Sequence, residues 1–339
     1  MNPRKTYWHL TNLQKRPDEY DIGTANLLHD DGRVFETDVP VLPWYREHAR
    51  ESFLYKEKLE QFEDPRRVTY RRYTEVQAAK EHFVDGLFSA IDATEYDRGL
   101  SESWIGVLDR VLPVLRYPVH GLQMASAYVA HLAPNGKLVV VGVFQCGDEL
   151  RRLQCLARRM HQLSLRTPDF GRHAREQWQD APAWQPLRKL IEELLVTYDW
   201  SEALIALQLV VKPMFDRLFM HGLARSAERA GDPLFGKLLF SLATDGDHQR
   251  EATRALFAML FENRPELRAR VQAHLTQWAT PTRAALHALL PLIDWEGTRA
   301  ASYAEDLDEF CESYWSSIGC SAGGNDGGSD DTRAGAETA

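Results

Sequence analysis

Two long helical patterns separated by a very short turn constrain the fold of this chain more than any other feature. Leu122, Ala125, Ser126 and Val129 follow the i, i+3, i+4, i+7 spacing of a buried helix face. A Pro-Asn-Gly turn follows, and a second helical pattern begins directly after it and continues to about residue 166. Because so short a turn brings the chain straight back, we expect an antiparallel pair of long helices at the centre of the fold.

Prolines, glycines and cap residues divide the rest of the chain. Residues 1–63 are rich in proline and in aromatic side chains, which favours an extended arm that lies on another surface. Residues 64–318 carry the helical patterns and form the expected domain, whereas residues 319–339 are acidic and Gly-rich and predict a disordered tail. The β-branched run 138–143 could form a strand, but its place between helical patterns favours helix. The predicted fold class is all-α.

Acidic residues mark three expected helix starts. Asp64 and Asp232 each precede a proline, which is the pattern of an N-cap followed by proline at the first helical position. Asp199 and Glu202 have the spacing of a capping box. We expect one helix from Asp64 to about residue 98, a second from Asp199 to about residue 229, and a third from Asp232 to about residue 263. Lys212-Pro213 lies inside the helix expected from Asp199 and predicts a kink there rather than a reactive lysine.

Composition excludes several classes of protein. With 339 residues, 44% of them hydrophobic, the chain can bury a core without disulfides or metals. A net charge of −9 argues against nucleic acid as a partner. The apolar runs are too short to span a membrane, and no apolar segment follows the basic start, so we expect a cytoplasmic protein. The cysteines lack CxxC spacing and are expected to be reduced thiols: Cys146, Cys155, Cys311 and Cys320.

Long helices of this kind can hold a diiron site, in which a Glu-x-x-His pair grips one metal because positions i and i+3 share a helix face. Of the twelve histidines only His248 has an acid three residues before it, Asp245. The same spacing occurs at Glu149 and Arg152, where an arginine stands in place of the histidine. Both pairs lie on long helices that follow another long helix, as a duplicated helix pair would place them.

This candidate metal site is incomplete. The Arg152 guanidinium stays protonated and has no lone pair for a metal. Residues 120–131, which should supply a lone carboxylate, contain no Asp or Glu. Glu202 could serve the second half, although capping is its more ordinary role. We therefore predict no catalytic, cofactor-binding or metal-binding residue, with Glu149, Arg152, Asp245 and His248 as vestiges of an ancestral site.

Two other readings stay open. Asp245, His248 and Glu202 could form the unusual site of an autonomous metalloenzyme, or the first two could be an ordinary local hydrogen-bonded pair. The four arginines of segment 66–72, interleaved with tyrosines, could bind RNA, although a solvated or subunit-facing surface is the more ordinary role of such a helix. The chain could also be a helical scaffold unrelated to metal chemistry.

Several ordered segments resemble the β subunit of bacterial multicomponent diiron monooxygenase hydroxylases, in the branch of the toluene, alkene and isoprene monooxygenases. The similarity runs in order from about residue 5 to about residue 310. The segments are 16–21 (RPDEYD), 44–45 (WY), 62–65 (FEDP), 70–73 (YRRY), 116–117 (RY), 120–124 (HGLQM), 199–203 (DWSEA) and 211–213 (VKP). The acidic Gly-rich ending departs from the usual pattern of that family.

The resemblance implies a ferritin-like bundle, similar to the ribonucleotide reductase small subunit, without iron ligands of its own. It implies a structural role beside α and γ subunits and a second β in an α2β2γ2 hydroxylase. In such a hydroxylase the diiron centre lies in the α subunit, and no cofactor is expected in this chain. The resemblance also implies an effector protein, a Rieske-type ferredoxin and an NADH-dependent reductase, which together oxidise a small hydrocarbon.

Overall fold

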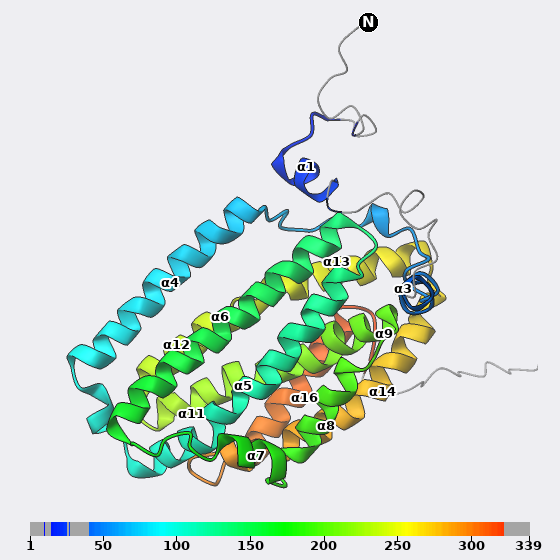
Figure 1. Cartoon of the computed structure of the whole chain (residues 1–339). Coiled ribbons are helices and arrows are strands. Elements are labelled where there is room, and N and C mark those ends of the chain that lie inside the picture. Colours follow the sequence, from blue (N-terminus) through cyan, green and yellow to red (C-terminus); the bar gives the residue numbers. More distant parts are fainter. Residues whose placement is uncertain (1–9, 11–14, 26, 28–40, 322–339) are drawn as a thin grey trace, which may run out of the picture.

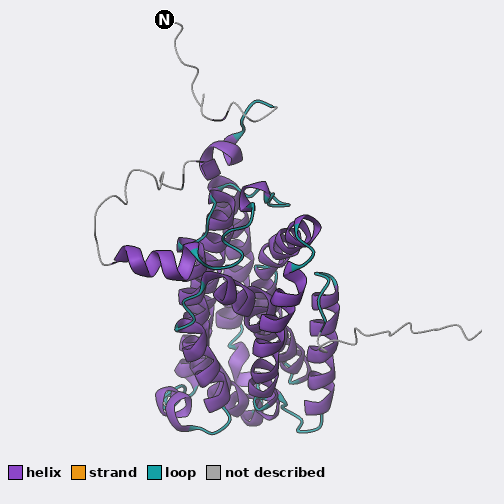
Figure 2. Ribbon diagram, turned by 90° about the vertical axis from the view of Figure 1, so that its right-hand side faces the viewer, coloured by secondary structure: helices purple, strands orange, loops and turns teal. Residues whose placement is uncertain are grey.

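The computed structural model describes residues 10, 15–25, 27 and 41–321, and all regular structure in these ranges is helical (Figures 1 and 2). The all-α prediction is therefore confirmed. The α-helices are α1 (Glu19–Ala25), α3 (Val41–Tyr45), α4 (Tyr70–Ala93), α5 (Glu102–His131), α6 (Gly136–Arg166), α7 (Ala174–Asp180), α8 (Gln185–Leu195), α9 (Trp200–Ile205), α10 (Lys212–Asp216), α11 (Leu223–Arg229), α12 (Pro233–Ala243), α13 (Gly246–Asn263), α14 (Leu267–His287), α15 (Leu290–Ile293) and α16 (Ala300–Ser316). Short π-helical turns cover Arg46–Arg50, Ala206–Val211 and Arg217–Gly222, and 3-10 turns cover Leu59–Gln61 and Tyr96–Gly99. None of the described helices is long and apolar enough to cross a membrane.

The central antiparallel pair is α5 and α6, as the short turn predicts. The Asn135 side chain accepts a hydrogen bond from the Leu138 backbone NH and so caps α6. The β-branched run 138–143 lies within α6, which settles the choice between helix and strand. A Cβ on Gly142 would lie 2.6 Å from the Cβ of Ala130, so the two helices approach one another closely at this position.

Residues 200–229 form one helical rod across the bundle, made of α9, α10, α11 and the two π-helical turns between them. The first π-helical turn, Ala206–Val211, ends directly before Lys212-Pro213. Because proline lacks a backbone NH, a local change of helical hydrogen bonding beside it is the expected response. The π-helical turn therefore stands directly before Lys212-Pro213, where a kink is predicted.

Two predicted helix boundaries are wrong. Helix α4 begins at Tyr70, not near Asp64, and its N-cap is Thr69, whose hydroxyl accepts from the Arg72 backbone NH at 3.1 Å. The helix expected from Asp232 to residue 263 is broken at 244–245 into α12 and α13. Asp232 itself caps α12 as predicted, because its carboxylate accepts from the Phe235 backbone NH.

Buried tryptophans fix the helices to one another. Trp104, Trp184, Trp200 and Trp315 are almost fully buried. The indole NH of Trp104 donates to Asp232 (3.1 Å), and that of Trp315 donates to the Leu209 carbonyl (2.7 Å). The rings of Trp104 and Trp315 thus add a large apolar surface to the core while each indole NH is bonded to a distant segment of the chain.

The segment before α4 packs more tightly on the bundle than the description of an extended arm suggests. Leu54 and Phe62 are fully buried, and the Leu54 backbone NH donates to the Ser201 hydroxyl at 2.9 Å. Helix α1 lies at one end of the bundle (Figures 1 and 2). The proposed division at residue 63 therefore stays a prediction, although residues 41–63 contribute to the common core.

The predicted tail begins slightly too early. Cys320 is buried, and the Ser321 backbone NH donates to the Gln272 side chain on α14 at 2.9 Å. Residues 319–321 therefore pack on the helical body. The remaining part of the predicted tail, 322–339, lies outside the described residues.

Candidate functional site

Four charged side chains form a closed ring between α6 and α10. Arg152 Nη1 lies 2.9 Å from Glu149 Oε2 and 2.8 Å from Asp216 Oδ1. Lys212 Nζ lies 2.8 Å from Glu149 Oε1 and donates a hydrogen bond to Asp216 Oδ2. We refer to Glu149, Arg152, Lys212 and Asp216 as the charge ring.

Sequence spacing explains how each helix supplies half of the ring. Glu149 and Arg152 are three residues apart on α6, and Lys212 and Asp216 are four apart on α10, so each pair shares a helix face. Gln145 and Gln208 lie one turn earlier on the same two faces and hydrogen-bond to one another. The two helices therefore meet along a ladder of polar pairs.

Burial makes the electrostatics of the ring strong. The four side chains are between 1% and 7% exposed. Burial alone would raise the pKa of Asp216, but the neighbouring Arg152 and Lys212 lower it to about 2. The same carboxylates raise the pKa of Arg152 against the effect of its burial. The two shifts have opposite directions, and both favour the charged forms of Arg152 and Asp216.

A second buried group holds Asp245 and Asp148. Asp245 Oδ1 accepts from Lys80 Nζ at 2.5 Å, and its Oδ2 accepts from Arg151 Nη1 at 2.7 Å. Asp148 accepts from Tyr73, Gln77 and Gln249, and the Gln77 amide also reaches Asp245 at 3.4 Å. Burial and the repulsion of Asp245 raise the pKa of Asp148 to about 7.

The predicted pairing of Asp245 with His248 is wrong. His248 Nε2 lies 2.9 Å from Asp64 Oδ1, while Asp245 faces Lys80 and Arg151. Asp64 also accepts from the backbone NH groups of Arg66 and Val68. The His248 contact and these two hydrogen bonds lower the pKa of Asp64 although its burial acts to raise it. His248 therefore anchors the segment before α4 to α13.

Glu202 lies at the start of α9 and turns toward α14. The Asp199 carboxylate accepts from the Glu202 backbone NH at 2.9 Å, so Asp199 is the N-cap as predicted. The Glu202 carboxylate, however, accepts from the Trp278 indole NH at 3.0 Å and from Gln277. The side-chain half of the expected capping box is therefore replaced by a contact between helices.

These positions decide how well the chain fits a diiron centre. The candidate ligands Glu149, Asp245, His248 and Glu202 each face different partners. In the part of the chain that the structure describes, no three His, Cys, Asp or Glu side chains converge as a metal site. The two carboxylates of the ring already accept from Arg152 and Lys212, which are donors without lone pairs for a metal. The residues present do not fit a diiron centre.

Sequence reasoning missed Asp216, Asp148 and the part played by Lys212. A signal was available, since Lys212 and Asp216 are an i, i+4 pair of opposite charge inside an otherwise apolar helix. Such a pair needs charged partners from another helix if it is buried. Which helix supplies them could not be known without the packing.

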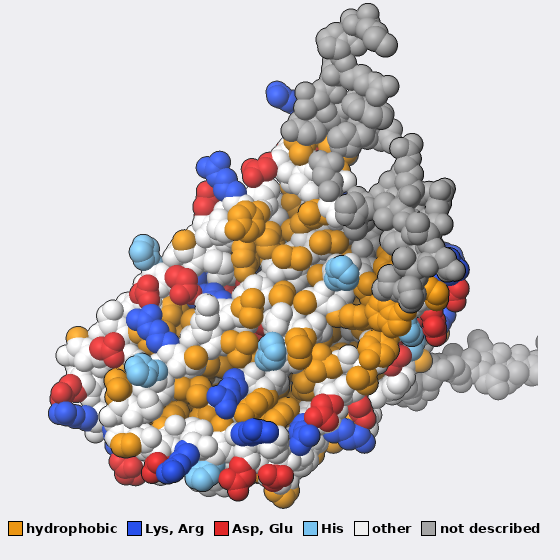
Figure 3. Space-filling view, viewed as in Figure 1, with side chains coloured by type: hydrophobic (Ala, Val, Ile, Leu, Met, Phe, Trp, Pro, Cys, Tyr) orange, Lys and Arg blue, Asp and Glu red, His pale blue; other side chains and the backbone are white. Residues whose placement is uncertain are grey.

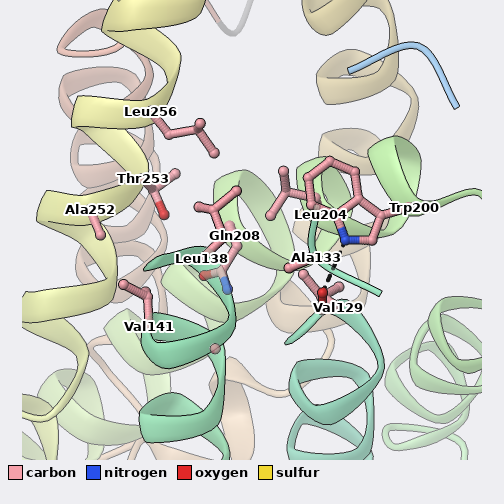
Figure 4. Close-up of a pocket in the computed structure, with 11 residues that line it drawn as sticks. Val129, Ala133, Leu138, Val141, Trp200, Leu204, Gln208, Ala252, Thr253 and Leu256 are labelled. Atoms are coloured by element: carbon pink, nitrogen blue, oxygen red, sulfur yellow. Dashed lines mark hydrogen bonds between the residues drawn. The ribbon is translucent and has the colours of Figure 1, made fainter. Parts of the chain in front are cut away.

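A small cavity lies between α5, α6, α9 and α13 (Figure 4). It measures about 30 Å³ and is lined mostly by apolar side chains, with Gln208 and Thr253 as polar members. The indole NH of Trp200 donates to the Val129 carbonyl at its edge (3.0 Å). This volume is that of about one water molecule, which is too small for an organic substrate.

The tyrosine and arginine segment at the start of α4 lies at the surface. Arg66 forms a bidentate ion pair with Glu251, at 2.6 and 2.8 Å. Arg67 binds Asp18 and Asp21, which ties α1 to the loop before α4. Tyr70 is largely exposed. Two of the four arginines therefore hold other parts of this chain.

A family model described as Methane/Phenol/Alkene Hydroxylase matches residues 44–264. The chain belongs to this hydroxylase family. It is 34% identical over 298 residues to the toluene-4-monooxygenase system hydroxylase component subunit beta of Ectopseudomonas mendocina, covering 86% of this chain and 91% of that protein. The resemblance to β subunits predicted from the ordered segments is confirmed.

Solved structures of this hydroxylase family share the fold. A chain of toluene 4-monooxygenase, determined with toluene bound in the resting active site, superposes with a TM-score of 0.81 at 33% identity, covering 86% of this chain and 98% of that one. A chain of phenol hydroxylase from Pseudomonas sp. OX1 gives a TM-score of 0.82 at 18% identity, over 95% and 97% of the two chains. The helical bundle is therefore that of the diiron hydroxylases.

Proposed function

We propose that this chain is the noncatalytic β subunit of a diiron monooxygenase hydroxylase, and that it supplies a helical frame for a partner α subunit. One observation carries the proposal: the polarity of α6 is inverted. Five of its charged residues, Asp148, Glu149, Arg151, Arg152 and Arg159, are buried inside the chain's own bundle, whereas Arg158 is 45% exposed. The outward side of the same helix is largely apolar.

The outward residues of α6 form a stripe from Val143 to Leu165. Val143, Leu150 and Leu165 are 51%, 47% and 74% exposed, and Gln154, Ala157 and His161 lie exposed between them. None of these six carries a permanent charge; Arg158, which is also exposed on α6, borders them and pairs with Asp85. We call Val143, Leu150, Gln154, Ala157, His161 and Leu165 the α6 stripe.

The neighbouring helix extends this surface. Met124 of α5 is 40% exposed, and His120 and His131 lie on the same side of that helix. Figure 3 shows hydrophobic and histidine side chains over α5 and α6, with most charged side chains toward the margins of this face. A groove of about 310 Å³ between α1, α4 and α6 continues it, with walls that include Val140, Val143 and Phe144.

An exposed apolar surface of this extent is typical of a protein interface rather than of a solvated face. Burial against a partner helix would stabilise the complex by about 25 cal/mol for each Å² of apolar area removed from water. The inward Glu149 of the same helix already pairs with Arg152 and Lys212, and the inward Asp148 accepts from Tyr73, Gln77 and Gln249, so neither carboxylate is free for a metal ion. Inverted polarity therefore supports both assembly and the lack of a catalytic site.

The finer parts of the proposal rest on the resemblance to other hydroxylases. We place the chain in a cytoplasmic α2β2γ2 hydroxylase of the NADH-dependent class, EC 1.14.13. The α subunit would hold the diiron centre and the hydrocarbon, for alkene epoxidation or aromatic hydroxylation. An effector protein, a Rieske-type ferredoxin and an NADH reductase would complete the system.

Two measurements test the proposal. The chain purified alone should contain no stoichiometric iron and should hydroxylate nothing. Coexpression with a chain that carries two Glu-x-x-His motifs should give a complex on size exclusion and oxygen-dependent turnover. About two irons per isolated chain, with an optical band that responds to oxygen, would refute the noncatalytic assignment.

A further inference from the structure

The charge ring has the connectivity of a dinuclear metal centre. Glu149 uses Oε2 for Arg152 and Oε1 for Lys212. Asp216 uses Oδ1 for Arg152 and Oδ2 for Lys212. Each carboxylate therefore bridges the same two cations, with one oxygen for each, as bridging carboxylates do between paired metal ions.

The position of the ring strengthens this comparison. It lies between α6 and α10, the middle part of the helical rod 200–229, and all four side chains are almost fully buried. Arg152 stands at the third position after Glu149, where a metal-binding helix pair would carry histidine. The terminal nitrogens of Arg152 and Lys212 thus stand where cations bridged by these carboxylates would stand.

We propose that Arg152 and Lys212 are built-in occupants of a latent dinuclear cation site, and that they keep divalent metal ions out of this chain. Their positive charges repel a metal ion from the carboxylates, and their nitrogens cannot ligate it in the protonated form. The inference concerns the metal selectivity of this chain and does not depend on which partner it assembles with.

Removal of both cations has a definite chemical consequence. Glu149 and Asp216 would face one another without compensation in a buried site. Two such carboxylates either take up protons or bind a cation, because two neighbouring buried negative charges without a counter-charge are strongly unfavourable. At a pH above the carboxyl range, a divalent metal is the competent replacement, and its binding should release protons.

The test uses the full chain with Arg152→His and Lys212→Gln combined, which restores an imidazole three residues after Glu149 and adds an amide oxygen. The probe is Co²⁺ alone, followed by equilibrium dialysis and by its visible ligand-field absorption. We expect the double variant to bind Co²⁺ at least tenfold more tightly than the wild-type chain, and Co²⁺ to raise its Tm.

A matched control removes the carboxylates as well. The quadruple variant, with Glu149→Gln and Asp216→Asn added, should bind no more Co²⁺ than the wild-type chain. If the double variant does not fold without metal, refolding from urea with and without Co²⁺ gives the same information, since the proposal expects recovery with Co²⁺. The proposal would be overturned if the wild-type chain or the quadruple variant bound Co²⁺ as tightly as the double variant does. It would also be overturned if the double variant neither bound Co²⁺ nor refolded better in its presence.

Discussion

At the scale of a single residue, Lys212 shows why removal of one member of a buried set of charges is costly. Its side chain is 7% exposed, and its ammonium contacts two carboxylates inside the bundle. Loss of one member of such a set leaves an uncompensated buried charge, which is far more costly than the loss of a surface ion pair. The energetic value of the ring is therefore visible mainly when it is broken.

Replacement of Lys212 by Met should lower the free energy of unfolding by about 3–5 kcal/mol, because Arg152 alone would then balance two buried carboxylates. Urea unfolding followed by circular dichroism measures the change. Lys189→Met is the matched control, since Lys189 is 77% exposed and only 3.6 Å from Glu193, and it should cost at most about 0.5 kcal/mol. A loss for Lys212→Met as small as the control's would show that the ring contributes little.

Asp148 gives the chain a pH dependence of known sign. Its pKa is about 7 in the folded chain and near 3.8 in the unfolded one, because burial and Asp245 disfavour its charge. The folded state therefore holds a proton that the unfolded state releases between pH 4 and 7. Stability falls as pH rises through this window, by up to about 1.4 kcal/mol per pH unit from this group.

Asp148→Asn should remove this term. The unfolding free energy of the wild type minus that of the variant should fall between about pH 4 and 7 and stay constant above pH 7. The variant should therefore gain stability relative to the wild type when the pH is raised from 4 to 8. Urea unfolding at a series of pH values measures it. Gln249 can present its amide oxygen to the new amide by a flip, which keeps the hydrogen bond. Parallel stability curves for the two proteins would contradict the assignment.

At the scale of helices, the close approach of α5 and α6 depends on the absence of a side chain at Gly142. A methyl group there would meet Ala130, whose Cβ and Cα would lie 2.6 and 3.1 Å away. Neither atom is at the end of a flexible side chain. The helices would therefore have to separate slightly along their contact.

Gly142→Ala should destabilise the chain by about 1–3 kcal/mol through this overpacking. Gly86→Ala, inside α4 with no atom within 4 Å of the added methyl, should instead stabilise it by about 0.5–1 kcal/mol through helix propensity. Thermal unfolding of the two variants side by side measures both signs. Equal changes in Tm for the two variants would mean that the contact between α5 and α6 accommodates a methyl group at residue 142.

The start of α4 shows how a tertiary contact can override a local sequence signal for a helix boundary. Asp64 precedes proline as a helix start would, yet its carboxylate is used by His248 and by two backbone NH groups of the following loop. The helix then starts later, at Thr69, which is itself a good N-cap. Asp199 and Asp232 cap as predicted although other side chains also donate to them. Asp232 accepts from the Phe235 backbone NH with one oxygen and from Trp104 with the other, and Asp199 accepts from both the Glu202 backbone NH and the Ser52 hydroxyl.

At the scale of the whole molecule, the α6 stripe should matter for assembly and not for folding. Leu150→Arg places a charge on a residue that is 47% exposed, so the free energy of unfolding of the isolated chain should change by no more than about 0.5 kcal/mol. A charge there would have to be desolvated against an apolar partner. The variant should therefore lose coelution with the coexpressed α subunit on size exclusion.

Ser302→Arg is the matched control for this experiment. It adds the same charge at an exposed position of α16, a helix whose outward residues already include Glu305 and Glu312. Assembly should be unchanged. If Leu150→Arg assembles as well as Ser302→Arg does, the interface lies on another face of the molecule.

The sequence by itself determined the helical class, the antiparallel central pair and the inability of Arg152 to bind a metal. These depend on spacings of three or four residues and on the chemistry of one side chain, which are local properties. Only the tertiary structure decided that Lys212 and Asp216 complete a ring with Glu149, and that His248 pairs with Asp64 rather than with Asp245. The physical reason is that contacts between helices depend on the rotation and register of each helix, which the packing of the whole core fixes.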